Sequence, residues 1–161
     1  MSAAPTRDWP NLTRVNTRRL LALITAPALI FTLTASTSAA TVEVSFTKLR
    51  AAKGKLMVCL TTKAKHFPDC SKDANARHVV ITAKEGAHTS FTGLPAGTYA
   101  VSVVHDENGN GKMDKAVMVP SEGFGFSRNP RVLFGPPSFK AASFKVDSGT
   151  VSQTVKMKYM L

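Results

Sequence analysis

Apolar and polar residues alternate with a period of two along most of the chain after residue 40, a pattern typical of β-strands. It is clearest in residues 42–47, where Val42, Val44 and Phe46 alternate with polar residues. The other segments with such alternation or a short apolar run are 56–61, 77–83, 89–92, 98–105 and 151–159. The helical period is almost absent from this part of the chain. The pattern therefore favours an all-β fold.

Turn residues separate these segments at short intervals, which indicates an antiparallel sandwich of about seven strands. The segment Leu94–Tyr99 reads L-P-A-G-T-Y and places a tyrosine just after a Pro-Gly turn. This arrangement resembles the tyrosine corner of immunoglobulin-like folds, in which the hydroxyl bonds back to the backbone. A plain turn followed by a half-buried tyrosine is the alternative. Because both interpretations are structural, Tyr99 receives no functional role.

The first forty residues have the features of an export signal. Three arginines, Arg14, Arg18 and Arg19, precede an apolar run over 20–35, and small residues at 38–40 offer a cleavage site before Thr41. The apolar run is shorter than the roughly 20 residues needed to span a bilayer. We therefore expect residues 1–40 to be a cleaved signal peptide and 41–161 a single domain, periplasmic or secreted and not transmembrane after cleavage. An uncleaved anchor is the alternative.

The chain is strongly basic, with 21 Lys and Arg against 10 Asp and Glu and a net charge of +11. The basic residues after residue 40 are scattered, and no basic run or aromatic-and-basic module is present. An exported protein also rarely meets nucleic acid. We therefore expect a solvated basic surface and no nucleic-acid partner.

The only two cysteines, Cys59 and Cys70, both lie in the expected mature chain. An even number of cysteines in an exported protein favours a disulfide. Closure of this short loop is worth about 3 kcal/mol on the chain-entropy model. A metal pair, with His66 and Asp69 lying between the cysteines, or two free thiols are the competing interpretations.

Residues 105–114 read H-D-E-N-G-N-G-K-M-D and match the first nine positions of a calcium loop, starting at Asp106. Side-chain oxygens alternate, a glycine stands at position 6, and position 7 offers a main-chain carbonyl. We therefore predict a weak structural calcium site, and no other cofactor, with these ligands: Asp106, Asn108, Asn110, Lys112 and Asp114.

The calcium prediction has a structural alternative, because an Asx- and Gly-rich turn bonds its own backbone in the same way. Val117 stands where an EF-hand has its bidentate glutamate, so the ligand set lacks one carboxylate unless Glu122 folds back.

Residues 106–142 form a long, strand-poor insert between two strong strand patterns. Its phenylalanines and tight glycine and proline turns favour a compact folded loop over disorder. Such an insert presents a surface to a partner or covers one end of the core as a lid. The candidates for partner binding are Glu122, Phe124, Phe126, Arg128 and Phe134.

Four segments carry a family resemblance. They are Phe91–Tyr99 (F-T-G-L-P-A-G-T-Y), His105–Asp114, Pro120–Ser127 (P-S-E-G-F-G-F-S) and Gly135–Phe139 (G-P-P-S-F). In this order and combination the chain resembles the small secreted bacterial domains of unknown function family 2141, over about residues 42–160. The resemblance implies a transthyretin-like or carboxypeptidase-regulatory-like sandwich. It implies no activity, substrate or catalytic residue.

The favoured function is a non-enzymatic periplasmic or secreted binding and interaction module, whose partner is an unknown envelope protein or a glycan. A carbohydrate-binding module is one alternative, but sugar sites need exposed amphipathic aromatics. The only tryptophan is Trp9, and Tyr99 and Tyr159 are predicted to face the core. An enzyme with a site centred on His105, beside Asp106 and Glu122, is the second alternative. No recognisable catalytic signature supports it.

Overall fold

Two β-sheets carry the fold, and the predicted all-β sandwich is confirmed. The computed structural model describes residues 39–116, 119–133 and 135–161. The strands are β1 (Ala40–Thr47), β2 (Lys55–Thr61), β3 (Arg77–Thr82), β4 (His88–Leu94), β5 (Gly97–Asp106), β6 (Lys115–Ala116), β7 (Val119–Pro120), β8 (Gly123–Phe126), β9 (Phe144–Val146) and β10 (Thr150–Lys156). The helical elements are the 3₁₀ turns η1 (Ala64–His66) and η2 (Cys70–Lys72) and the helix α1 (Phe139–Ala142).

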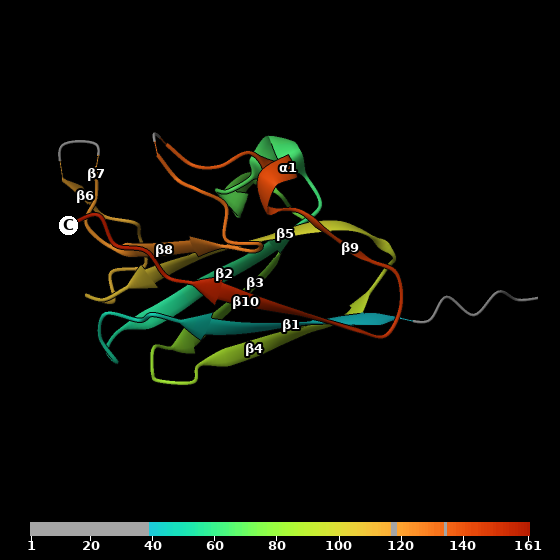
Figure 1. Ribbon diagram of the computed structural model, residues 1–161, viewed down its shortest axis with the longest axis horizontal. Coiled ribbons are helices and arrows are strands. Elements are labelled where there is room, and N and C mark those ends of the chain that lie inside the picture. Colours follow the sequence, from blue (N-terminus) through green and yellow to red (C-terminus); the bar gives the residue numbers. More distant parts are fainter. Residues whose placement is uncertain (1–38, 117–118, 134) are drawn as a thin grey trace, which may run out of the picture. The chain divides into compact units, whose positions relative to one another are not determined.

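The smaller sheet has the order β10-β1-β4, and the larger has the order β3-β2-β5-β8 with β9 also paired to β5. Figure 1 shows β10, β1 and β4 running side by side. Most pairs are antiparallel, as predicted, but β1 and β10 are parallel, with Thr41 opposite Thr150. The remaining strands, β6 and β7, form a short hairpin of their own.

The period-two pattern of β1 places alternate side chains in the core between the sheets. Val42, Val44 and Phe46 are buried, whereas Glu43 and Ser45 are exposed. Strands β2 and β5 are instead buried over most of their length. They are central in the larger sheet and are covered on both faces, whereas the edge strand β3 is mostly exposed.

The insert supplies the cover on the outer face of the larger sheet. Strand β8 pairs antiparallel with β5, and Phe124 and Phe126 are buried there in a second apolar cluster. Phe126 packs against Phe67, with ring centroids 5.7 Å apart. Ser138 caps α1, which contributes the buried Ala142 to the same cluster. This segment therefore covers the core, in agreement with the lid interpretation.

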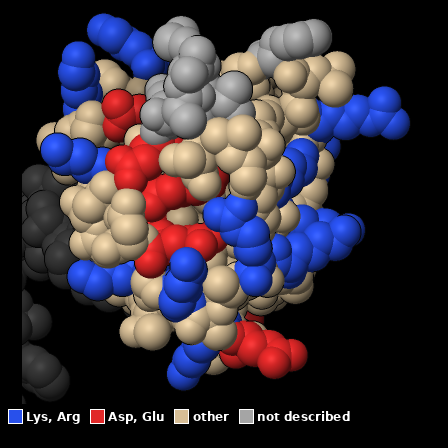
Figure 2. Space-filling view, turned by 90° about the vertical axis from the view of Figure 1, so that its left-hand side faces the viewer, with Lys and Arg blue, Asp and Glu red and all other residues tan. Residues whose placement is uncertain are grey.

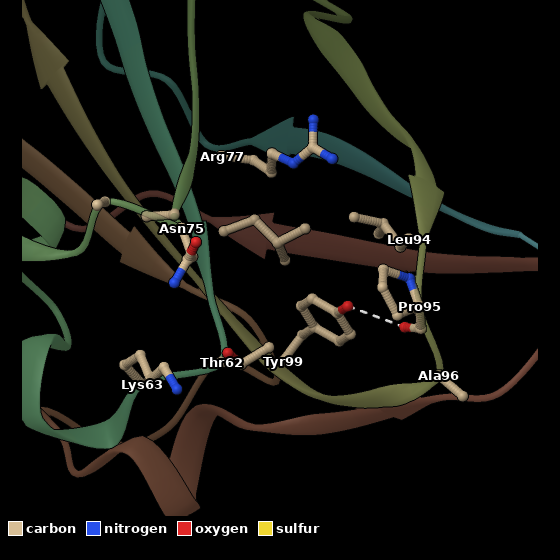
Figure 3. Close-up of a pocket in the computed structure, with 11 residues that line it drawn as sticks. Thr62, Lys63, Asn75, Arg77, Leu94, Pro95, Ala96 and Tyr99 are labelled. Atoms are coloured by element: carbon tan, nitrogen blue, oxygen red, sulfur yellow. Dashed lines mark hydrogen bonds between the residues drawn. The ribbon is translucent and has the colours of Figure 1, made fainter.

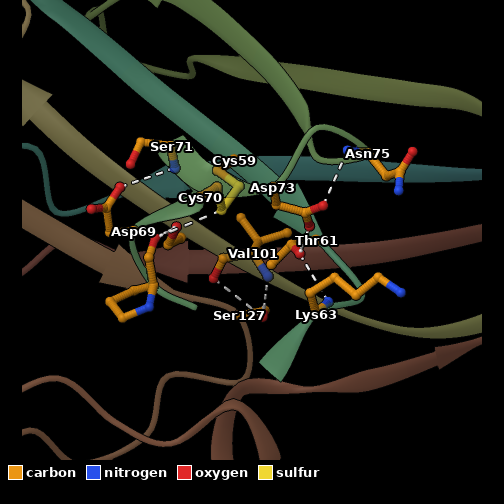
Figure 4. The surroundings of a disulfide bond; sticks show 12 residues. Cys59, Thr61, Lys63, Asp69, Cys70, Ser71, Asp73, Asn75, Val101 and Ser127 are labelled. Carbon is orange, nitrogen blue, oxygen red and sulfur yellow. Dashed lines mark hydrogen bonds between the residues drawn. A yellow bond between two sulfur atoms is a disulfide. The ribbon is translucent and has the colours of Figure 1, made fainter. Parts of the chain in front are cut away.

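A disulfide joins Cys59 of β2 to Cys70 of η2, as predicted, with the two Cα atoms 6.5 Å apart. Figure 4 shows its surroundings. The buried Asp73 follows η2 and accepts a 2.6 Å hydrogen bond from the Thr61 hydroxyl. It also accepts the backbone N–H of Asn75. The covalent bond and the Thr61–Asp73 pair together hold the 62–76 connection against the end of β2.

Residues 1–38 lie outside the described residues, and the predicted signal peptide lies almost entirely among them. Strand β1 begins at Ala40, one residue before the expected start of the mature chain. Over the residues that are described, no helix has the length and apolar character needed to cross a bilayer.

Candidate functional site

The loop that follows β5 folds around the carboxylate of Asp106. This residue is fully buried, and its two oxygens accept the backbone N–H groups of Gly109, Asn110 and Gly111 at 2.7, 3.1 and 2.8 Å. Gly109 and Gly111 both have positive φ, 77° and 75°, which side-chain-bearing residues rarely adopt. The glycines therefore permit the tight turn that brings three N–H groups to one carboxylate.

The two asparagines of the loop turn toward Asp114. The side-chain amide nitrogens of Asn108 and Asn110 donate to Oδ2 of Asp114 at 2.6 and 2.7 Å. Their oxygens accept the backbone N–H groups of Asn110 and Lys112. The structure thus brings together the four side chains of the predicted calcium loop, and Lys112 lies within the same turn. These contacts fit the Asx-turn alternative equally well.

Glu122 joins this cluster from outside the loop. The β6–β7 hairpin leads the chain back, so that Ser121 N–H bonds the Asp114 carbonyl and Glu122 Oε2 accepts the Asp114 N–H at 3.3 Å. Glu122 is only 5% exposed, and its Oε1 atom is buried with no hydrogen-bond partner among the described residues. Burial raises the pKa of Glu122, the backbone N–H groups of Asp114 and Glu107 oppose this rise, and the charges of Asp106 and Asp114 add to it.

Several acidic side chains gather on one face of the domain. Figure 2 shows them as a column surrounded by lysines and arginines, at the end that Figure 1 places beside the β6–β7 hairpin. Within the described ranges, no three His, Cys, Asp or Glu side chains form a group that could hold a metal ion by themselves. A cation here would therefore depend on amide and main-chain oxygens as well.

Glu107 belongs to a different network, although it is next to Asp106 in sequence. It forms ion pairs with Arg50 at 2.9 Å and with Lys53 at 3.3 Å. Burial alone would raise the pKa of Glu107, but the bonds from these two cations outweigh it and lower the pKa. Glu107 is therefore neutralised by its own cations.

His105 is fully buried beneath this network. One ring nitrogen, Nδ1, lies 2.7 Å from the Tyr159 hydroxyl, and the other, Nε2, lies 2.8 Å from the Lys53 carbonyl. Because both nitrogens are engaged, neither is open to a substrate in this structure. The arrangement gives no support to the hypothesis of an active site centred on His105.

The candidates for partner binding do not form one surface. Glu122, Phe124 and Phe126 are buried. Arg128 is exposed, but its guanidinium donates to the Ser143 carbonyl at 3.0 Å. Phe134 lies outside the described residues. Phe124 and Phe126, which the sequence suggested as partner-binding residues, instead pack into the fold. Their side chains cover the apolar outer face of the larger sheet.

At the opposite end of β5, an open cleft of about 700 Å³ lies between the two sheets. Leu60 of β2, Leu94 of β4 and Tyr99 of β5 provide apolar walls. Figure 3 shows Lys63, Asn75 and Arg77 around this cleft, with Leu94 and Pro95 on the facing side. Sequence reasoning missed this site, because its residues come from segments far apart in the chain and its cations resembled a scattered basic surface.

Tyr99 supports one wall of this cleft. Its hydroxyl donates to the Pro95 carbonyl at 2.8 Å, which confirms the predicted bond back to the backbone. Burial raises the pKa of Tyr99, and the positive charge of Arg77 partly offsets that rise. Among the described residues, neither Arg77 nor Lys63 forms an ion pair with an acidic side chain. The cleft therefore has a mixed polar and apolar lining, with positive charge at its margin.

Comparison with known proteins identifies the family. No curated protein and no solved structure matches the chain. Residues 44–154 match the family described as an uncharacterized protein conserved in bacteria (DUF2141). This range covers more than half of the chain and includes the second half of β1, the cleft, the loop after β5 and most of β10. The chain therefore belongs to the DUF2141 family, as its four motifs predicted.

Proposed function

We propose that the domain is a non-enzymatic binding module of the periplasm or cell exterior. Its ligand site is the cleft between the sheets, and its ligand is a small anionic amphiphile with an apolar body. The observation that carries this proposal is the pair Lys63 and Arg77, which lie at the margin of the cleft and form no ion pair with any described residue.

The volume of the cleft and the two cations at its margin support this ligand class. Small-molecule sites are usually concave, largely apolar and about 300–1,000 Å³ in volume, with a few polar groups that fix orientation. A guanidinium binds carboxylate or phosphate through two parallel hydrogen bonds, and a lysine adds a point charge. The net charge of the chain also attracts anions over a longer range.

The proposal also covers the folds to which this domain is related and the cellular compartment in which it lies. The four sequence motifs suggest a relationship to transthyretin-like and carboxypeptidase-regulatory-like sandwiches, and the Tyr99–Pro95 bond supports the broader class of immunoglobulin-like sandwiches. The Cys59–Cys70 disulfide supports an oxidising compartment, because such bonds are rare in the cytosol. Both agree with export of the chain by the signal predicted in residues 1–40.

The test uses decanoate as the probe, measured by calorimetric titration of the purified protein. Decanoate should bind, whereas decanol, which has the same chain but no charge, should bind at least about tenfold more weakly, since a charge-assisted hydrogen bond is worth about 1.5–3 kcal/mol. Arg77→Gln should weaken decanoate binding by a similar factor. Lys84→Gln is the matched control, because Lys84 is an exposed lysine outside the cleft.

Three results would contradict the proposal. They are equal affinity for decanol and decanoate, no effect of Arg77→Gln, and an equal loss in Lys84→Gln. Binding of a neutral oligosaccharide in place of decanoate would favour the carbohydrate-binding alternative.

A further inference from the structure

Acidic residues are few in this chain, yet they concentrate at one end of β5. Of the 10 Asp and Glu residues, four lie between residues 106 and 122. Glu107 is neutralised by Arg50 and Lys53. The other three, Asp106, Asp114 and Glu122, form no ion pair with any described residue. Backbone N–H groups satisfy Asp106 and side-chain amides donate to Asp114, so the buried oxygen of Glu122 is the group that needs a specific explanation.

Glu122 is the group that points to a ligand. Its side chain lies against the loop through the Asp114 N–H, while the second oxygen is buried and unpartnered among the described residues. A buried polar atom without a hydrogen bond is costly, and a buried charge without a partner is more so. Either a proton or a cation must therefore accompany this carboxylate.

Arg50 and Lys53, two cations close to the cluster, are already engaged. The Arg50 guanidinium bonds Glu107, the Ser121 carbonyl and the Leu161 carbonyl, and Lys53 bonds Glu107. In place of a positive charge, Asp114 receives only the two neutral amide donors of Asn108 and Asn110. Rotation of an asparagine side-chain amide by half a turn exchanges the positions of its oxygen and its nitrogen. The same asparagines can therefore serve as oxygen ligands.

We propose that Asp106, Asp114 and Glu122, together with the oxygens of Asn108, Asn110 and Lys112, bind a calcium ion. Glu122 supplies the carboxylate that the loop lacks at Val117. The sequence indicated the loop residues and left open whether Glu122 folds back to join them. The additional observation is that a buried, unpartnered carboxylate oxygen from a different segment lies beside them.

The donor set selects calcium among metals. It consists of carboxylate, amide and main-chain oxygens, which hard cations prefer over thiolate and imidazole sites. Calcium takes six to eight such oxygens in flexible geometry, whereas magnesium demands a compact octahedron and retains several waters. His105, the nearest nitrogen donor in sequence, uses both ring nitrogens elsewhere.

The site would act as a clamp on the fold. Glu122 directly precedes β8, whose Phe124 and Phe126 cover the outer face of the larger sheet. Asp106 ends β5, the strand that pairs with β8. A cation held by both residues would fix the start of β8 to the end of β5. This site is independent of the cleft, which lies at the other end of β5.

The experiment titrates calcium into the purified, chelator-treated protein by calorimetry, with thermal unfolding measured in parallel. Binding should fall in the range of about 0.1–1 mM typical of extracellular modules, and the melting temperature should rise with calcium. Magnesium at the same concentrations should give a smaller rise. Glu122→Gln preserves the shape of the side chain and should weaken calcium binding at least about tenfold, since loss of even an outer partner costs that much.

Glu107→Gln is the matched control, because it removes an adjacent carboxylate that is already paired with Arg50 and Lys53. It should leave calcium affinity unchanged. For each variant we compare the rise in melting temperature that calcium causes. A variant that is less stable without calcium therefore remains informative. The proposal is overturned if calcium gives no heat and no shift, in which case Glu122 carries a proton. It is also overturned if Glu122→Gln responds like the parent protein or if magnesium is as effective as calcium.

Discussion

The Tyr159 hydroxyl lies 2.7 Å from Nδ1 of His105 and also accepts the backbone N–H of Arg50 at 3.0 Å. The Arg50 N–H can only donate a hydrogen bond, so the Tyr159 hydroxyl can donate its own proton to Nδ1 of His105. The other nitrogen, Nε2, faces the Lys53 carbonyl, which can only accept. The network is therefore satisfied by the tautomer with its proton on Nε2. It ties the last residues of the chain to β5 and to the 48–54 turn.

Removal of the hydroxyl in Tyr159→Phe should destabilise the domain by about 1–3 kcal/mol, because Nδ1 of His105 would be left buried without a partner. Chemical denaturation followed by circular dichroism measures the change. Long-range ¹⁵N–¹H spectra of the parent protein should show the proton on Nε2. A change in unfolding free energy below about 0.5 kcal/mol, or a proton found on Nδ1, would contradict this account.

The glycines of β8 are required by close packing. A Cβ atom at Gly125 would lie 2.5 Å from Cγ1 of the buried Val155, and one at Gly123 would overlap the Tyr159 ring. Gly125→Ala should therefore cost about 1–3 kcal/mol through overpacking. If Val155 is the obstacle, Val155→Ala should relieve part of that cost. The double variant should then be less destabilised than the sum of the two single variants, and simple additivity would argue against the contact.

These glycines also explain why β8 was not predicted. The segment G-F-G-F has no polar residue in alternation, so the sequence shows phenylalanines in a loop and gives no strand signal. Its strand character depends on pairing with β5 and on the approach of Val155 from β10. The alternation in β1 is local and was sufficient to predict both the strand and its buried face. The parallel pairing of β1 with β10 joins the two ends of the domain, and no local pattern predicts it.

The same difference between local and long-range contacts separates the two candidate sites. Contacts within the Asp106–Asp114 loop join residues at most six apart, so spacing alone predicted which side chains would meet. The position of Glu122 depends on the β6–β7 hairpin. The cleft depends on four separate segments that meet only in the folded chain. For Glu122 and the cleft residues, the sequence shows which chemical groups are present but not that they lie close together in the folded chain.

The disulfide should stabilise the domain mainly by restricting the unfolded chain. Cys59 and Cys70 are 11 residues apart and close a short loop, for which the chain-entropy model gives about 3 kcal/mol. The double variant Cys59→Ser/Cys70→Ser should be less stable by about that amount in denaturant unfolding. Reduction of the parent protein should produce a similar loss. Complete alkylation of the native protein without a reductant would show instead that the thiols are free.

The Thr61–Asp73 hydrogen bond should make stability depend on pH in the acidic range. The Thr61 hydroxyl, 2.6 Å away, lowers the pKa of Asp73 in the folded protein, more than burial raises it. The pKa of the carboxyl is about 3.9 when the chain is unfolded. The ionised form therefore favours the folded state, and this stabilisation is fully present above the unfolded pKa. It is lost as the pH falls through the folded pKa, because below it both states carry the proton.

Thr61→Val tests this linkage, because it removes the donor and nearly preserves the shape of the side chain. The variant should lose stability at pH 7, and the loss relative to the parent should shrink as the pH falls below about 4. The other carboxylates contribute equally to both proteins and cancel in the comparison. Asp73→Asn should show the same convergence, since it removes the titrating group. A stability difference that stays constant between pH 7 and the acidic range would mean that the hydroxyl supports Thr61 packing and does not stabilise the Asp73 charge.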